Sequence, residues 1–271
     1  MHTTKQDWLN DALAANGYFV SGHASTERVL GLKGKAEVRF AMLKDGKAVY
    51  FLTIRSPEPN YREMYWKAFE TNMLGWLRSI YQPLIQLFYH DDQETFDVFF
   101  PAKGTFKQLS FQGLADFVGK YNSSFTTKPG TKKEVNTTTN DIFHHWTRNY
   151  LSSSCVVADL DAFTFNMHQA VFYELKRVKE SVRTWRPYLD DHRNYAALDK
   201  IARAHGGVAI TLAYQATGDP VVAMHRHLNL EQPECIRGQM QLLDKEVAVR
   251  HPLAVDFSAI SSYTSTNQRQ K

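Results

Sequence analysis

The chain has 271 residues, a mass of 31.2 kDa and a formal net charge of +4, which suit one or two globular domains and permit a polyanionic partner. Its 43% hydrophobic and 22% charged residues exclude a disordered chain, and its two cysteines, Cys155 and Cys235, lack the spacing of a disulfide scaffold or a structural zinc site. The segment from Met1 to Tyr18 is too polar for a signal peptide, and no apolar run reaches the roughly 18 residues of a membrane span. We therefore expect a cytoplasmic protein that does not cross a membrane.

The first half, residues 1–121, has the pattern of a small α/β domain. Runs rich in β-forming residues at 37–43 and 48–55 flank an Asp45-Gly46 pair, which favours a tight hairpin. Apolar residues at helical spacing predict a helix over 61–81, which Pro83 ends. Residues 84–89 and 95–100 then predict a second hairpin around a polar turn.

A polar segment at 122–140 predicts a linker, followed by a second α/β domain over 141–260 and a flexible tail over 261–271. The second domain repeats the order of the first, with strands at 155–165 and 170–177, a helix at 192–204, and strands at 208–214 and 220–225. When residues 48–55 are aligned with 169–176, Thr53 falls at Glu174 and Arg55 at Lys176. If the repeat is real, the first copy lacks a carboxylate and should not bind a catalytic metal. Alternatively, the two segments are unrelated and share only a common element order.

Two acids and a lysine in the second domain form the strongest chemical pattern. Side chains alternate along a strand, so Asp159 and Asp161 share one face of the first strand, and Glu174 and Lys176 share one face of the next. Paired carboxylates would repel one another unless a cation lies between them. Magnesium binds through one or two carboxylates plus a phosphate oxygen, which Asp161 and Glu174 can provide, with Asp159 as an auxiliary acid. Lys176 is then placed to orient a water molecule or stabilise charge on a phosphate.

This stretch resembles the PD-(D/E)XK, or restriction-endonuclease-like, nuclease superfamily. The family pattern is an acid at a strand start, followed on the adjoining strand by Glu or Asp, any residue, and Lys. Here Asp161 and Glu174-Leu175-Lys176 match it, although Ala158 or Leu160 stands where the family's proline would be. The resemblance implies an α/β fold with a mixed sheet flanked by helices and a Mg²⁺-dependent endonuclease in which Mn²⁺ can substitute. It also implies DNA as substrate and a homodimer or a partner protein for a duplex break.

A basic stretch after the motif is the candidate nucleic-acid surface. The candidate residues of this stretch are Arg177, Lys179, Arg183, Arg186 and Tyr188. Asn194 and Tyr195 belong to the following helix, near Asp191, and we expect all three to face the substrate groove as well. The alternative is a solvated helix face. The resemblance also makes Asp141 a candidate for the extra acid that some relatives carry before the core. His225 and His227 form an HxH pair, but no third metal ligand stands at a recognisable spacing.

A competing interpretation removes the site altogether. Val171, Leu175, Val178, Val182 and Trp185 also fall at helical spacing, so residues 169–185 could form one amphipathic helix with Glu174 on its surface. The nuclease pattern therefore depends on residues 170–176 being a strand beside Asp161. The first hypothesis is a metal-dependent DNA endonuclease with its core in the second half, the first half being a degenerate copy or a DNA-recognition and dimerisation domain. The second is a non-catalytic nucleic-acid-binding or assembly protein with the same fold, and the third is a small-molecule-binding α/β protein.

Overall fold

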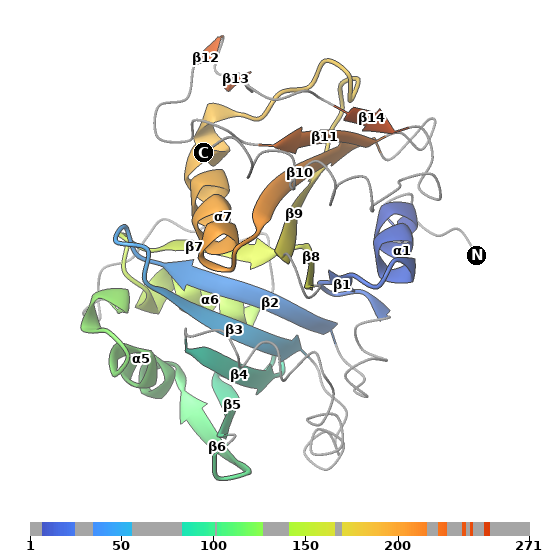
Figure 1. Cartoon of the computed structure of the whole chain (residues 1–271). Coiled ribbons are helices and arrows are strands. Elements are labelled where there is room, and N and C mark those ends of the chain that lie inside the picture. The colour runs from blue at the N-terminus through green and yellow to red at the C-terminus, as the bar shows by residue number, and fades with distance from the viewer. Residues whose placement is uncertain are drawn as a thin grey trace. The chain divides into compact units, whose positions relative to one another are not determined.

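The computed structural model shows a mixed α/β chain whose described strands form two six-stranded sheets and one short strand pair (Figure 1). The residues it describes are 7–24, 35–55, 83–100, 102–126, 141–165, 170–215, 222–226, 235–236, 239–240 and 247–249. The predicted helix over 61–81, most of the predicted linker and the predicted tail lie outside these residues. Among the described helices, none is long and apolar enough to cross a membrane.

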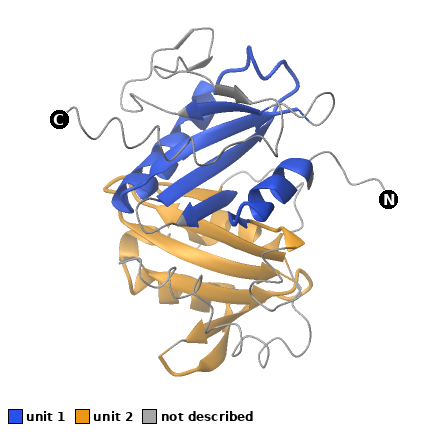
Figure 2. Cartoon of the chain, turned by 45° about the vertical axis from the view of Figure 1, so that its right-hand side comes forward, with its two compact units in different colours: residues 1–20, 160–271 blue, residues 21–159 orange. Residues whose placement is uncertain are grey.

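The chain divides into two compact units, each described separately below (Figure 2). Unit 1 comprises residues 1–20 and 160–271, and unit 2 comprises residues 21–159. This division differs from the predicted boundary at 122–140. The reason is visible in the sheets: residues 142–159 add a helix and a strand to unit 2, whereas the first helix and strand of the chain belong to unit 1.

Unit 1 is built on a mixed sheet in the order β1-β8-β9-β10-β11-β14. These strands are β1 (Phe19–Val20), β8 (Ala162–Phe165), β9 (Ala170–Arg177), β10 (Val208–Tyr214), β11 (Val222–Arg226) and β14 (Val247–Val249). Strand β9 runs antiparallel to β8 and parallel to β10, and β10 runs antiparallel to β11. A separate strand pair joins β12 (Cys235–Ile236) to β13 (Gln239–Met240).

Two helices cover the two faces of this sheet. Alternate β9 residues Val171 and Tyr173 bury against α1 (Asp7–Ala15) in a core that includes Leu13. The intervening residue Phe172 points the other way and contacts His205, at the C-terminal end of α7 (His192–Ala204). The Glu174 and Lys176 side chains share the α7 side with Phe172, because strand side chains alternate.

Unit 2 has a second mixed sheet, in the order β6-β5-β4-β3-β2-β7. Its strands are β2 (Lys35–Met42), β3 (Ala48–Arg55), β4 (Leu84–Tyr89), β5 (Thr95–Phe100), β6 (Thr105–Ser110) and β7 (Val156–Leu160). Helices α5 (Phe111–Gly119) and α6 (Ile142–Tyr150) pack on one face, where Phe51, Phe96 and Trp146 are fully buried. The short helix η1 (Ser123–Phe125) buries Phe125 in the same core, so this part of the predicted linker is integral to the unit.

Both predicted hairpins of the first half and the predicted strands and helix after Gln169 are confirmed. Gly46 has a φ of +87° at the turn between β2 and β3, which is the left-handed conformation that the Asp-Gly pair predicts. The predicted single strand over 155–165 was wrong. It is two strands, β7 in the sheet of unit 2 and β8 in the sheet of unit 1, separated at Asp161.

The two units share a pairing order. In unit 2, β2–β3 is antiparallel, β3–β4 parallel and β4–β5 antiparallel. In unit 1, β8–β9, β9–β10 and β10–β11 follow the same sequence of directions. The predicted repeat of element order is therefore present in the strand pairing, although the helix that would complete the first copy lies outside the described residues.

Candidate functional site

The site in unit 1 depends on the register between β8 and β9. Ala162 and Tyr173 form the last pair of this ladder, and Asp161 and Glu174 are the residues next to that pair on the two segments. The Asp161 Oδ2 atom accepts the backbone N–H of Leu175 at 2.7 Å, just beyond the last paired residues. The Asp161 carboxylate is thus fixed beside the strand that carries Glu174.

Residues 170–177 form a strand, so the competing interpretation of a helix over 169–185 was wrong. After Arg177 the chain continues as an irregular loop to Tyr188, in which Val178, Val182 and Trp185 are buried. Those three residues imitate a helical stripe because the loop turns back on itself to bury them against Ala213 and Ala223. The structural condition for the sequence motif is therefore met.

Lys176 lies at the centre of a polar cluster on the α7 side of the sheet. Its Nζ atom is 2.9 Å from Glu174 Oε1 and 3.3 Å from Asp191 Oδ2. The Tyr195 hydroxyl donates to the same Asp191 oxygen at 3.4 Å, and the Lys176 ammonium lies 5.6 Å from the centre of the Tyr195 ring. Two carboxylates, those of Glu174 and Asp191, thus contact the Lys176 ammonium, while Asp161 contacts the backbone of the neighbouring Leu175.

Burial and charge act in opposite directions on Lys176. Partial burial alone would lower its pKa, but the negative charges of Glu174 and Asp191 and their hydrogen bonds raise the pKa above its ordinary value. Lys176 is therefore a fixed cation at neutral pH. Burial raises the pKa of the Tyr195 hydroxyl, which remains a neutral donor to Asp191.

The sequence placed Asp191 among residues of the following helix that could face the substrate groove, but it did not predict the contact of Asp191 with Lys176. Asp191 ends the short helix η2 (Leu189–Asp191) and precedes α7 directly, so the start of α7 brings its carboxylate to Lys176. The signal available in the sequence was an acidic pair, Asp190-Asp191, at a helix start. Acids are common there because the helix dipole favours them, so the pair did not stand out.

The predicted nucleic-acid residues divide into exposed and buried groups. Arg177, Lys179, Arg183 and Tyr188 are exposed on the end of β9 and the loop that follows. Arg186 and Asn194 are half-buried, and an Arg186 Nη1 atom donates to the backbone oxygen of Trp185 at 2.8 Å. Tyr195 is only 1% exposed, so stacking on a base is excluded, and its place is structural.

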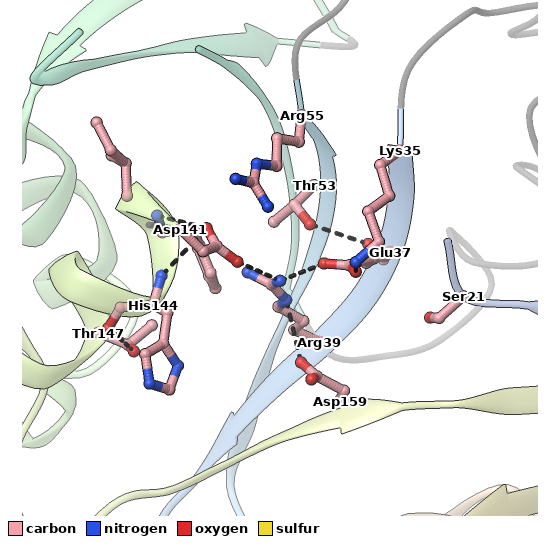
Figure 3. A network of polar contacts seen from close by, with 12 residues as sticks. Ser21, Lys35, Glu37, Arg39, Thr53, Arg55, Asp141, His144, Thr147 and Asp159 are labelled. Atoms are coloured by element: carbon pink, nitrogen blue, oxygen red, sulfur yellow. Dashed lines mark hydrogen bonds and ion pairs between the residues drawn. The ribbon is translucent and has the colours of Figure 1, made fainter. Parts of the chain in front are cut away.

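Asp159 and Asp141 belong to a different polar network, within unit 2 (Figure 3). Its centre is Arg39 on β2, whose Nη2 atom pairs with Asp141 Oδ2 at 2.6 Å and also with Glu37, and whose Nε atom lies 3.0 Å from Asp159 Oδ1. The Arg39 side chain is 8% exposed, and its guanidinium lies 5.0 Å from the centre of the Phe143 ring. Asp159 therefore does not share a strand face with Asp161, because the strand is interrupted at Asp161 and its two parts enter different sheets.

Asp141 has a structural role in this network. It is the N-cap of α6, where its Oδ1 atom accepts the backbone N–H of Phe143 at 2.9 Å and the Tyr89 hydroxyl at 2.9 Å. Burial would raise its pKa, but Arg39 and the Tyr89 hydrogen bond lower it below the ordinary value. Asp141 thus serves as a cap and an ion-pair partner in unit 2.

The histidines give no metal centre in the described part of the chain. His225 is 1% exposed and packs edge-on against Trp185, and burial lowers its pKa to about 4. His227 lies outside the described residues. Across the residues that the structure describes, no three His, Cys, Asp or Glu side chains form a group that could hold a metal ion by themselves. Magnesium needs fewer protein ligands than that, since it commonly keeps waters and takes a substrate phosphate as a ligand.

Comparison with known proteins supplies no relative: no protein-family model matches the chain, and no characterised protein matches it at a significant level.

Proposed function

We propose that the protein is a metal-dependent endonuclease that hydrolyses phosphodiester bonds in DNA, with its site in unit 1. The observation that carries the proposal is the hydrogen bond from the Leu175 N–H to Asp161, which holds this acid beside β9, where Glu174 and Lys176 share one face. An acid at a strand start and Glu-X-Lys on the adjoining strand are the pattern of the restriction-endonuclease-like superfamily. The mixed sheet with helices on both faces supports the same assignment.

The donor chemistry of the site fits a hard divalent cation. Asp161 and Glu174 offer only oxygen atoms, and a carboxylate that accepts one N–H bond, as Asp161 does from Leu175, still has lone pairs for a metal. We assign Mg²⁺, with Mn²⁺ as a substitute, to Asp161 and Glu174. When bound, the ion polarises the scissile phosphate and lowers the pKa of a water molecule.

Lys176 and Asp191 have separate roles in this proposal. Lys176 stabilises the negative charge that develops on the phosphate, since its raised pKa keeps it protonated at neutral pH. Asp191 and Tyr195 fix the position of the ammonium, through the 3.3 Å contact of Lys176 with Asp191 and the hydrogen bond of Tyr195 to Asp191. The ligand set uses unit 1 alone and leaves Asp159 in its ion pair with Arg39.

The exposed cations beyond β9 suit the path of the DNA backbone. Arg177, Lys179 and Arg183 are exposed and follow directly from the strand that carries Glu174 and Lys176. Tyr188 is 42% exposed and is available for stacking. A single site cuts one strand, so a duplex break requires a homodimer or a partner protein; we also propose a cytoplasmic location.

A plasmid-nicking assay in Mg²⁺ tests the proposal. Glu174→Gln and Lys176→Met should each reduce nicking at least about 100-fold, in line with losses of a group that stabilises the transition state. Glu94→Gln, an exposed acid in the β4–β5 turn of unit 2, is the matched control and should retain full activity. EDTA should abolish nicking and added Mg²⁺ should restore it.

The outcomes separate the hypotheses. Salt-sensitive DNA binding without cleavage in either Mg²⁺ or Mn²⁺ would support a non-catalytic nucleic-acid-binding protein instead. Nicking that survives in both the Glu174 and Lys176 variants would refute the assigned site. Absence of any salt-sensitive DNA binding would count against both hypotheses, because phosphate contacts by lysine and arginine make binding depend on salt.

A further inference from the structure

Unit 2 contains a cleft of about 450 Å³ between β6 and α5. Its apolar surface comes from Phe100, Leu109 and Phe117, and its cationic rim comes from Lys103, Lys107 and Lys120. The volume lies within the roughly 300–1,000 Å³ that is usual for ligand pockets. None of these residues belongs to the site in unit 1.

The local sequence accounts for the two walls of the cleft. Strand β6 is the edge strand of its sheet, and Lys107 and Leu109 lie on one face of it because side chains alternate. On α5, Gly113 and Phe117 follow at helical spacing, and Lys120, the C-cap residue, continues the same side. Ser110 ends β6 and caps α5 by accepting the Gly113 N–H at 3.1 Å, so the walls join through one residue.

The cleft carries an excess of positive charge. All three rim lysines are exposed, and within the described residues no ion pair engages any of them. The single acid on the cleft wall, Asp116, accepts a hydrogen bond from Gln112 at 2.8 Å. Three lysines against one aspartate favour an anionic ligand.

Aromatic rings adjoin the lysines. The Phe117 ring contacts Phe100 with centroids 5.3 Å apart and Tyr121 with centroids 5.5 Å apart, both edge to face. Tyr121 is 47% exposed and directly follows Lys120. The half-buried Phe117 ring and the exposed Tyr121 ring thus lie beside cations, an arrangement that suits unpaired bases, whose flat faces stack while their phosphates contact lysines.

We propose that this cleft binds a segment of single-stranded nucleic acid, with a base against Phe117 and Tyr121 and phosphates on Lys103, Lys107 and Lys120. A single strand fits better than a duplex because a stacked and paired base cannot present its face to the rings. The inference rests on the proposed function for its choice of a nucleic-acid partner, but it needs no cleavage. Binding at the cleft and nicking in unit 1 can therefore fail independently.

The test is fluorescence anisotropy of a 5′-labelled oligothymidylate of 12 nucleotides with the full-length Glu174→Gln variant in EDTA, which excludes cleavage. A Lys107→Gln, Lys120→Gln double variant should bind at least about 10-fold more weakly. For this double variant, the slope of log affinity against log salt concentration should be about 1.4 less steep, since each phosphate contact to a single strand contributes about 0.7. Lys47→Gln with Lys200→Gln removes the same charge from two exposed lysines outside the cleft and should change affinity less than 2-fold.

A second variant tests the aromatic contact without altering charge. Tyr121→Ala should weaken binding about 5- to 100-fold, in line with the cost of losing a base–aromatic stack. Because the Tyr121 ring is exposed, its removal should leave the fold intact, and an unchanged circular dichroism spectrum would exclude unfolding as the cause of weaker binding. Equal losses in the cleft and control lysine variants, or full binding by Tyr121→Ala, would overturn the proposal. Displacement of the oligonucleotide by inorganic phosphate as effective as by unlabelled oligonucleotide would show a simple anion site and would also overturn it.

Discussion

Replacing Asp141 with Asn separates the two tasks of a buried carboxylate in unit 2. Asn is as good an N-cap as Asp, so it keeps the α6 cap, but it removes the negative charge that faces Arg39 at 2.6 Å. The Asp141 side chain is 12% exposed and that of Arg39 is 8% exposed, so water compensates little for the lost pair. The variant therefore isolates the value of the charge.

The expected loss follows from the contacts. Removing one partner of a buried ion pair costs roughly 3–5 kcal/mol, and the remaining pairs of Arg39 with Glu37 and Asp159 reduce that figure. We expect Asp141→Asn to lower the free energy of unfolding by about 2–3 kcal/mol. Asp141→Ala should cost about 1 kcal/mol more, because it also removes the cap. Asp159→Asn is the matched control: its side chain is 57% exposed, so the loss should stay below about 1 kcal/mol.

The pH dependence gives an independent check of the same carboxylate. The pKa of Asp141 is below 3.8 in the folded protein, so its stabilising contribution is fully present above pH 3.8 and is lost as pH falls through the folded value. The Asn variant cannot protonate there. The stability difference between the wild type and Asp141→Asn should therefore shrink as the pH falls below about 4.

Hydrogen exchange of peptides from β2 and α6 is the appropriate assay, because it reports unit 2 separately from unit 1. Urea titration followed by circular dichroism provides the global value. A loss for Asp141→Asn no greater than that for Asp159→Asn would refute the argument from burial. Equal losses for the Asn and Ala variants would show that the cap contributes nothing measurable.

Three further predictions concern unit 1 and can be tested by thermal or urea unfolding. Gly207→Ala should cost about 3 kcal/mol or more, because its added carbon would lie 2.1 Å from the Ala170 carbonyl oxygen. Gly206→Ala, at φ +64° in open space, should cost only about 1–2 kcal/mol, and equal losses would contradict the close approach. The pKa of His225 is about 4 in the folded protein, so the folded state prefers the neutral ring. The free energy of unfolding should therefore be unaffected by this group above pH 6.5 and should fall by at most about 3 kcal/mol as the pH drops towards 4. His225→Phe should flatten this decline. Lys176→Met should destabilise by about 1–2 kcal/mol, because it removes the ion pairs with Glu174 and Asp191, and an unchanged stability would argue against those pairs.

Local signals in the sequence were sufficient to predict those elements whose backbone conformation depends on nearby residues. The Asp45-Gly46 pair predicted the β2–β3 hairpin because a left-handed turn favours glycine, and periodic apolar residues predicted α7. Helix α6 was missed because its sequence is rich in histidine and aromatic residues, which have modest helix propensity. Its stability comes from the Asp141 cap and from burying Phe143 and Trp146, which are tertiary effects.

Long-range pairing explains the other differences. The run from Cys155 to Phe165 alternates as a single strand would, and nothing local marks the change of sheet at Asp161. In residues 169–185, by contrast, two different segments look like one element: buried residues of a strand and of a loop together have the spacing of a helix. In both cases the partner strand decides the outcome, and the partner is distant in sequence.

The repeated strand order also indicates why the proposed chemistry belongs to unit 1. Glu37 pairs with Thr53 across β2 and β3, and in unit 1 Asp161 and Glu174 follow the last pair of β8 and β9. In unit 2 the second position is a buried threonine whose hydroxyl donates to the Glu37 carbonyl, and Lys35 and Arg39 neutralise the Glu37 carboxylate. The corresponding positions of unit 1 hold two acids. Carboxylate oxygens are the ligands that a divalent cation prefers, so the glutamate that stands where unit 2 has threonine is the difference on which the proposed activity depends.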